Sequence, residues 1–103
     1  MSSSSTAYVT QRAGVCGGLP VVAGSRTPVW MLAEAYLRSR GSVNVGYRRF
    51  PQRSRAEVLA ALLYFEEHRR EIIAQIRAAT RERRRLAATT ATWLKRRRGR
   101  RAA

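Results

Sequence analysis

The chain has 103 residues, enough for one small domain with a modest core, and its formal net charge is +15. Residues 69–103 hold 13 basic and 2 acidic side chains, so most of this charge lies in the last third of the chain. The balance indicates a polyanion or an acidic protein surface as a partner. Composition alone is weak evidence for this, because 20 of the 21 cationic residues are arginine, a bias that coding preference also produces.

Two observations bear on where the protein resides. Cys16 is the only cysteine, so the chain cannot form an internal disulfide, and we expect a reducing, cytoplasmic location. No apolar run approaches the roughly 20 residues needed to span a bilayer. The opening residues have neither the basic nor the apolar region of a secretion signal. Membrane insertion and secretion are therefore not expected.

The N-terminal part has the pattern of turns and short strands. Residues 1–6 offer nothing to bury and are expected to form a disordered leader. Tyr8 and Val9 can start a short strand. Residues 21–23 and 26–29 are brief extended pieces between glycine and proline residues, which predicts turns with a small strand or hairpin.

A first helix is predicted from Thr27, with threonine as the N-cap and Pro28 at the first helical position. Gly41 supplies its C-terminal stop. Trp30 and Met31 lie off the core stripe and are either exposed or face a second subunit. The stripe consists of apolar residues at helical spacing, namely Val29, Leu32, Ala33, Tyr36 and Leu37.

Two further helices follow, with a short turn between them. Ser42 can cap the first of these, which runs to about Phe50. Gly46 in its middle costs roughly 1 kcal/mol relative to alanine, so tertiary packing must hold this helix. The next helix begins with Ser54 and Glu57 at capping-box spacing. Apolar residues cover most of its circumference, so it needs two packing partners. Two helices joined by a short turn are the layout of a helix-turn-helix.

The helical pattern is expected to continue past His68. The β-branched residues Thr89, Thr90 and Thr92 favour fraying, and residues 95–101 are expected to be disordered by self-repulsion until a partner neutralises them. The apolar positions keep spacings of three and four, and they are Ile72, Ile73, Ile76, Ala79, Leu86, Trp93 and Leu94.

Two segments carry ordered motifs: residues 18–29 read GLPVVAGSRTPV, and residues 51–72 read PQRSRAEVLAALLYFEEHRREI. They are similar to G-x-P-x-x-x-G-T-R-I-P-V and P-x-L-S-x-x-x-V-x-A-A-L-x-Y-x-x-x-H-x-x-E-I of the domain-of-unknown-function family numbered 433. These are small bacterial and archaeal proteins treated as VapB-like antitoxins. The resemblance spans about residues 8–72. The matching positions are Gly18, Pro20, Gly24, Arg26, Pro51, Ser54, Val58, Ala61, Leu62, Tyr64, His68 and Glu71.

The resemblance implies a helix-turn-helix related to winged forms, usually dimeric, which binds its own promoter and neutralises a PIN-domain ribonuclease encoded beside it. The sequence departs from the family's pattern at several positions. Ser25 and Thr27 replace threonine and isoleucine, and Arg53 stands where a turn leucine is usual. Residues 44–46, Asn-Val-Gly, stand where such sequences usually read acidic-acidic-apolar.

The expected fold class is mainly α, with a three-helix helix-turn-helix core of winged-helix-like type. A short N-terminal β-strand or hairpin precedes the core, and a basic helical extension follows it. The domain boundaries are a disordered leader at residues 1–6, an antitoxin-like helix-turn-helix domain at residues 7–76, and an arginine-rich tail at residues 77–103 that is partly helical and then disordered.

Basic residues around the predicted turn are the candidates for DNA contact, since arginine suits both phosphates and base edges. They are Arg48, Arg49, Arg53 and Arg55. The alternative is a solvated charged face. Arg26 lies beside the first motif's glycine and is interpreted as structural, pairing with Glu34 or a backbone carbonyl.

Dimerisation is expected through the apolar third helix, at Leu63 and Tyr64, together with Trp30. The tail is expected to engage either nucleic acid or a groove of an acidic toxin, and these two alternatives use the same charge. The tail residues concerned are Arg83, Arg84, Arg85, Trp93, Lys95, Arg96, Arg97 and Arg98.

The residues give no sign of catalysis, a metal site or a cofactor. His68 is the only histidine, so a packing or capping role is favoured over a metal ligand or a general base. Glu66 and Glu67 are adjacent in a helix and do not form an acid–base pair. We therefore do not expect an enzyme, and the resemblance leads us to expect an antitoxin that regulates transcription. The alternative is a basic nucleic-acid-binding protein without a toxin.

Overall fold

The structure, a computed structural model, describes the backbone of residues 7–102 and the side chains of residues 7–99. The expected disordered leader at residues 1–6 lies outside the described residues. The elements in chain order are β1 (Val9–Thr10), a 3-10 turn η2 (Cys16–Gly18), β2 (Val21–Val22), α1 (Val29–Arg38), α2 (Val43–Arg49), α3 (Arg55–Glu67) and α4 (Arg69–Ala102). The fold is therefore mainly helical with a short two-stranded sheet.

The predicted N-terminal hairpin is confirmed, although its partners differ from the expected extended pieces. Strands β1 and β2 are antiparallel, with Val9 opposite Val22 and Thr10 opposite Val21. The second extended piece contributes only a single bridge, between Val21 and Pro28. The N–H of Val29 then donates to the Pro20 carbonyl, 2.9 Å away, so the hairpin leads directly into α1.

Helix α1 begins one residue later than predicted, because Pro28 keeps an extended backbone to make that bridge and serves as the N-cap. The predicted core stripe is largely correct, but Leu37 is 38% exposed, and Ala35, which was not in the stripe, is buried. The hydrophobic core lies where α1, α3, the first turn of α4 and the hairpin meet. Its fully buried large side chains include Val22, Val29, Leu32, Val58, Phe65 and Ile72.

Helix α2 packs against α3 through Gly46, which is buried. A Cβ atom added at Gly46 would lie 2.9 Å from Cγ1 of Val58, closer than real contacts of this kind. The absence of a side chain therefore lets the two helices approach closely. This contact supplies the tertiary packing that the sequence predicted α2 would need.

The predicted capping box at the start of α3 is confirmed. The backbone N–H of Glu57 donates to Oγ of Ser54 at 3.1 Å, and the N–H of Ser54 donates to the Glu57 carboxylate at 2.8 Å. Two backbone donors that a helix start leaves without partners are thus satisfied.

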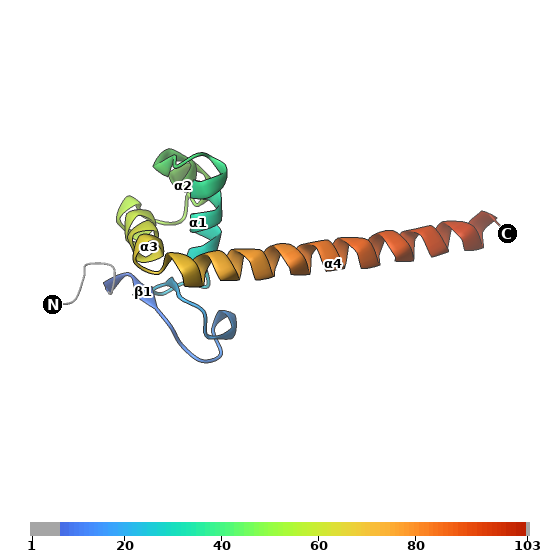
Figure 1. Cartoon of the computed structure of the whole chain (residues 1–103), viewed down its shortest axis with the longest axis horizontal. Helices are drawn as coiled ribbons and strands as arrows, with labels where there is room; N and C mark the ends of the chain where they lie inside the picture. Colours follow the sequence, from blue (N-terminus) through green and yellow to red (C-terminus); the bar gives the residue numbers. More distant parts are fainter. Residues whose placement is uncertain (1–6, 103) are drawn as a thin grey trace.

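The helical pattern continues past His68 as expected, but in a separate helix, because α3 ends at Glu67 and α4 begins at Arg69. The backbone of His68 leaves the helical region, at φ −131° and ψ 41°, and α4 begins at the next residue in a new direction (Figure 1). Nδ1 of His68 lies 2.9 Å from the Tyr64 carbonyl oxygen, and its backbone N–H also donates to that oxygen. The bend brings Ile72 into the core, where it is fully buried next to the other apolar side chains.

Helix α4 runs to Ala102, whereas the sequence predicted fraying near residue 90 and disorder from residue 95. The threonine hydroxyls donate to carbonyls one turn earlier, from Thr89 to Arg85 at 3.0 Å and from Thr92 to Ala88 at 2.9 Å. Arginine, alanine and leucine, which dominate this segment, are strong helix formers. Over the described residues, no helix is both long and apolar enough to cross a membrane.

Candidate nucleic-acid interface

The turn between α2 and α3 brings several predicted DNA-contacting residues to one region of the surface. Arg48 and Arg49 occupy the last turn of α2 and are exposed. The chain then reverses through a turn in which the N–H of Arg53 donates to the Phe50 carbonyl at 2.9 Å. The cations at the end of α2 also compensate the negative end of its dipole.

Arg49 and Arg53 lie at the same shallow hollow, which has a volume of about 220 Å³. The hollow is open to solvent at the turn, so an anionic group could approach both guanidinium groups. Its other lining residues are Thr27, Phe50, Pro51 and Gln52.

Arg53 is held by an ion pair and is not a free cation. Its Nη1 lies 3.4 Å from the carboxylate of Glu57, and both side chains are 22% exposed. The hydrogen bond from the Ser54 backbone, and to a smaller extent that from the Ser54 hydroxyl and the charge of Arg53, lowers the pKa of Glu57 below its ordinary value of 4.5. The geometry thus assigns Arg53 a part in stabilising the turn.

Arg55, at the first position of α3, is exposed and lies against α2. Its guanidinium carbon is 5.0 Å from the centre of the Tyr47 ring, within the range of a cation–π contact. This contact limits the directions available to the side chain. Arg48, Arg49 and Arg55 are therefore the exposed cations on the two helices that flank the turn.

Beyond Arg55, the exposed face of α3 carries two leucines, and the acidic residues Glu66 and Glu67 follow them at the end of the helix. Leu59 is 48% exposed and Leu63 is 42% exposed, and they lie one turn apart on the same side of the helix. The sequence showed only that apolar residues cover most of this helix, and the structure shows which side is covered: α3 buries Val58 and Ala61 and leaves Leu59 exposed. Exposed leucines at this spacing suit a protein contact better than contact with phosphates.

The other two residues predicted at a dimer interface are less accessible than Leu63. Trp30 is half-buried and packs against the hydrophobic core, while its neighbour Met31 is exposed. Tyr64 stacks on His68, with ring centres 4.0 Å apart. Burial raises the pKa of the Tyr64 hydroxyl, and the negative charges of Glu71 and Glu67 raise it further.

The predicted basic residues of α4 differ in what their side chains contact. Arg83 lies against the domain, with Nη2 2.6 Å from the carboxylate of Glu34 on α1, and Arg85 donates to Glu82 from Nε at 3.1 Å. Arg97 covers the ring of Trp93, with its guanidinium carbon 5.1 Å from the ring centre. The remaining predicted tail residues are exposed along the helix, and they are Arg84, Lys95, Arg96 and Arg98.

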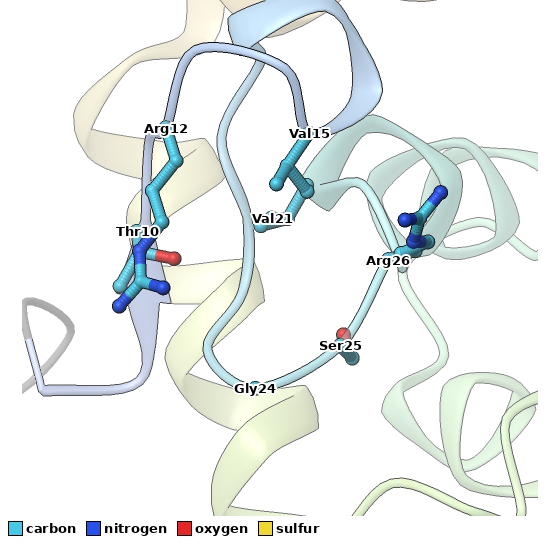
Figure 2. Close-up of a pocket in the computed structure, with 7 residues that line it drawn as sticks. All are labelled: Thr10, Arg12, Val15, Val21, Gly24, Ser25 and Arg26. Carbon is cyan, nitrogen blue, oxygen red and sulfur yellow. The ribbon is translucent and has the colours of Figure 1, made fainter.

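A second hollow, of about 260 Å³, lies in the N-terminal loops and includes Arg12 and Arg26 (Figure 2). In this view Arg12 runs along β1 towards Thr10, and the guanidinium of Arg26 points away from it on the other side. Of the two partners considered for Arg26, Glu34 or a backbone carbonyl, the first is wrong, because the Glu34 carboxylate pairs with Arg83 and Arg38. The two arginines of this hollow do not converge on a common point.

Within residues 7–102, no three histidine, cysteine or acidic side chains gather closely enough to hold a metal ion. Cys16 is a free thiol whose Sγ lies 3.2 Å from the Arg26 carbonyl oxygen. His68 is the C-terminal cap of α3. This agrees with the capping or packing role favoured for it.

These elements define a small, mainly helical protein with an N-terminal hairpin and a basic surface at a turn between two helices. Residues 9–65 match the protein family described as "Protein of unknown function (DUF433)", and the chain belongs to this family. The match ends within α3, so α4 lies outside it.

A solved structure with a similar fold is the crystal structure of a DUF433 member protein from Anabaena variabilis ATCC 29413. It shares 28% sequence identity with this chain, with a TM-score of 0.57, and the alignment covers 67% of each chain. No curated protein matches the chain.

Proposed function

We propose that this protein is the antitoxin of a type II toxin–antitoxin pair of VapB-like kind, which binds its own promoter DNA through α2, the turn and α3. The observation that carries the DNA-binding part is the grouping of Arg48, Arg49 and Arg55 as exposed cations around that turn. Such residues can contact phosphates on both sides of a groove that a helix enters.

The β1–β2 hairpin extends the proposal to a winged-helix-like arrangement. The hairpin contacts α3 on the side opposite to solvent, through Val9 and Val22 in the core. In this proposal the hairpin supports α3 from its buried side and corresponds to the wing of winged-helix folds.

In this proposal the protein acts as a cytoplasmic homodimer. The exposed leucines Leu59 and Leu63 on α3 support a two-fold contact, because one face repeated on both subunits would cover both leucines. Dimerisation would also place two copies of the α2–α3 turn on successive half-sites of DNA. The PIN-domain ribonuclease toxin is the proposed protein partner.

The second candidate function is that of a basic nucleic-acid-binding protein without a toxin. The observation that favours it is α4, whose strongly basic end lies outside the family match. The two functions differ in their protein partner. An adjacent reading frame with the spaced acidic residues of a PIN domain, whose product co-purifies with this chain, supports the antitoxin. A soluble neighbour that never associates excludes it.

Promoter binding is tested by electrophoretic mobility shift with the DNA upstream of the coding region and with scrambled DNA of the same length. The variant is the triple change of Arg48, Arg49 and Arg55 to glutamine. Its control is the same change at Arg12, Arg26 and Arg77, which are exposed cations outside α2 and α3.

The expected result is that only the first triple variant loses the preference for upstream over scrambled DNA. Each lost phosphate contact should also lower the slope of log K against log salt by about 0.9. If both triple variants weaken binding equally, the surface around the turn has no special role and the helix-turn-helix proposal fails.

A further inference from the structure

Helix α4 consists of two parts that differ in their surroundings. The first part, residues 69–83, packs on the domain: Ile72 is buried, Ile73 and Ile76 contact the core, and Arg83 pairs with Glu34. The second part, residues 84–102, extends away from the domain (Figure 1). Every side chain described in it is exposed. We call residues 84–102 the arm, and at 1.5 Å per residue it is about 28 Å long.

The charge of the arm restricts what can bind it. It contains 8 arginine and lysine residues and no acidic residue. A second copy of the arm is a poor partner, since the two helices would repel each other along their whole length. The arm therefore requires a partner with a high density of negative charge.

Trp93 is the second feature of the arm: it is 53% exposed and stands two residues before the basic cluster that begins at Lys95. It borders two shallow hollows. One, of about 320 Å³, is also lined by Leu94, Arg97 and Arg98. The other, of about 360 Å³, is lined by small side chains and one cation, namely Ala88, Thr89, Thr92 and Arg96.

Arg97, which covers the indole, lines the first hollow and not the second. At the second hollow the neighbours of Trp93 are alanine and threonine, which leave room for a flat group beside the ring. Arg96 stands at the edge of that hollow, where it can meet a phosphate attached to such a group.

We propose that the arm binds single-stranded nucleic acid, with Trp93 stacking on an unpaired base and Arg96, Arg97 and Arg98 contacting the adjoining phosphates. An exposed aromatic ring among arginines is the combination that single-strand binding uses, because stacking tolerates any base and the cations follow the backbone. In a duplex the faces of the bases are covered by their neighbours, so the indole would find no ring to stack on. This role rests on α4 alone and is independent of the proposed antitoxin function.

The ion pair between Arg83 and Glu34 explains how the domain presents the arm. It joins the end of the packed part of α4 to α1, with Nη2 and Oε2 2.6 Å apart. The arm starts at the next residue and so projects from the domain with its whole circumference accessible. A strand can therefore wrap the arm without displacing any contact of the domain.

The proposal is tested on the full-length protein by following tryptophan fluorescence during titration with oligouridylate and oligothymidylate of about 15 nucleotides, a length that single-strand sites commonly occupy. A duplex of the same length is the comparison, and each titration is repeated at several salt concentrations. Trp30→Phe leaves Trp93 as the sole tryptophan reporter. The two oligonucleotides distinguish RNA from DNA as the preferred strand.

Single strands are expected to quench Trp93, whereas the duplex leaves its fluorescence nearly unchanged. The affinities of the Trp93 variants, which lack this reporter, are measured by the fluorescence anisotropy of a dye-labelled oligonucleotide, with the wild type measured in the same way. Trp93→Leu, which keeps an apolar side chain, is expected to weaken single-strand binding by about 5- to 150-fold, the range for loss of one stacked base. Trp93→Phe should retain most of the affinity. Leu86→Ala is the matched control, since Leu86 is also an exposed apolar residue of the arm, and it should leave the affinity unchanged.

Two results would overturn the proposal. Equal affinity for single strands and duplex, with no effect of Trp93→Leu, would mean that the arm only attracts phosphate charge. Displacement of the oligonucleotide by polyglutamate at equal charge concentration, with the same dependence on Trp93, would mean that the arm fits an acidic protein instead. Circular dichroism of each variant verifies that α4 is retained, so that loss of binding is not loss of the helix.

Discussion

Gly46 of α2 and Val58 of α3 approach so closely that a single added carbon would not fit: a Cβ atom at Gly46 would lie 2.9 Å from Cγ1 of Val58. Val58 is fully buried and belongs to the hydrophobic core. The glycine that weakens α2 as an isolated helix therefore allows α2 to dock on α3. This contact sets the relative position of the two helices that flank the proposed DNA-binding turn.

Gly46→Ala should destabilise the protein despite the better helix propensity of alanine. The propensity gain is about 1 kcal/mol, while overpacking a core typically costs about 1–3 kcal/mol. We expect a net loss of about 1 kcal/mol in the free energy of unfolding, measured by denaturant titration. Gly99→Ala is the control, because nothing lies within 4 Å of a Cβ atom there, and it should not destabilise.

Val58→Ala tests the mechanism of that loss. Alone it should destabilise the protein by leaving a cavity. Combined with Gly46→Ala it removes the clash, so the double variant should lose less free energy of unfolding than the two single losses added together. Strict additivity would show that the two side chains do not meet.

The capping box of α3 should make part of the stability depend on pH. The pKa of Glu57 is lowered, chiefly by the backbone hydrogen bond from Ser54, so the folded state favours the ionised carboxylate. The contribution is therefore fully present above about pH 4.5, the ordinary value, and is lost as the pH falls through the lower folded pKa.

Thermal unfolding of the wild type and Glu57→Gln at a series of pH values measures this contribution. The difference in melting temperature should be constant near neutral pH and shrink as the solution is acidified below pH 4.5. Ser54→Ala should cost about 1 kcal/mol at neutral pH, as for other N-cap substitutions. A difference that persists unchanged in acid would show that the Glu57 charge does not support the cap.

The local features of this fold could be predicted from the sequence, whereas those set by distant contacts could not. Ser54 and Glu57 are three residues apart and form their hydrogen bonds within one turn, so their pattern alone was sufficient. The bend at His68 has no glycine or proline to signal it. It depends on burial of Ile72 in the core that the other helices form.

The candidate site was predictable to the same limited degree. The position of Arg48 and Arg49 at the end of α2 followed from the helix pattern. One of the two partners of Glu34 did not, because Arg83 lies 49 residues away along the chain and only the folded structure brings it to α1. The exposure of Leu59 was also hidden, because a helix that is apolar all round does not reveal which side its neighbours leave uncovered.

Arg83→Gln should loosen the junction between the domain and the arm. The ion pair is partly exposed, with 50% of Arg83 and 15% of Glu34 accessible, so we expect a loss of at most about 1 kcal/mol in the free energy of unfolding. Hydrogen exchange should quicken in residues 79–86 and stay unchanged in α3. Arg84→Gln, at the exposed residue next to it, is the control. Equal effects of the two changes would show that the contact with Glu34 does not anchor α4.

Leu63→Glu should abolish the proposed dimer without unfolding the subunit. Leu63 is 42% exposed, so a carboxylate there remains solvated in the monomer. In a two-fold contact through α3 the new charge would be buried or would face its own copy, and either arrangement strongly opposes association. Leu59→Glu should act in the same way, because both leucines lie on one face of the helix.

Sedimentation equilibrium at several protein concentrations measures this effect, and Leu86→Glu on α4 is the matched control, because Leu86 is also an exposed leucine. The wild type and Leu86→Glu should sediment as dimers and the two α3 variants as monomers with unchanged circular dichroism. If Leu63→Glu remains dimeric, the subunits meet through another surface. The leucine face of α3 would then be free for the proposed toxin. Co-purification of Leu63→Glu with the product of the adjacent reading frame would decide whether that contact uses Leu63.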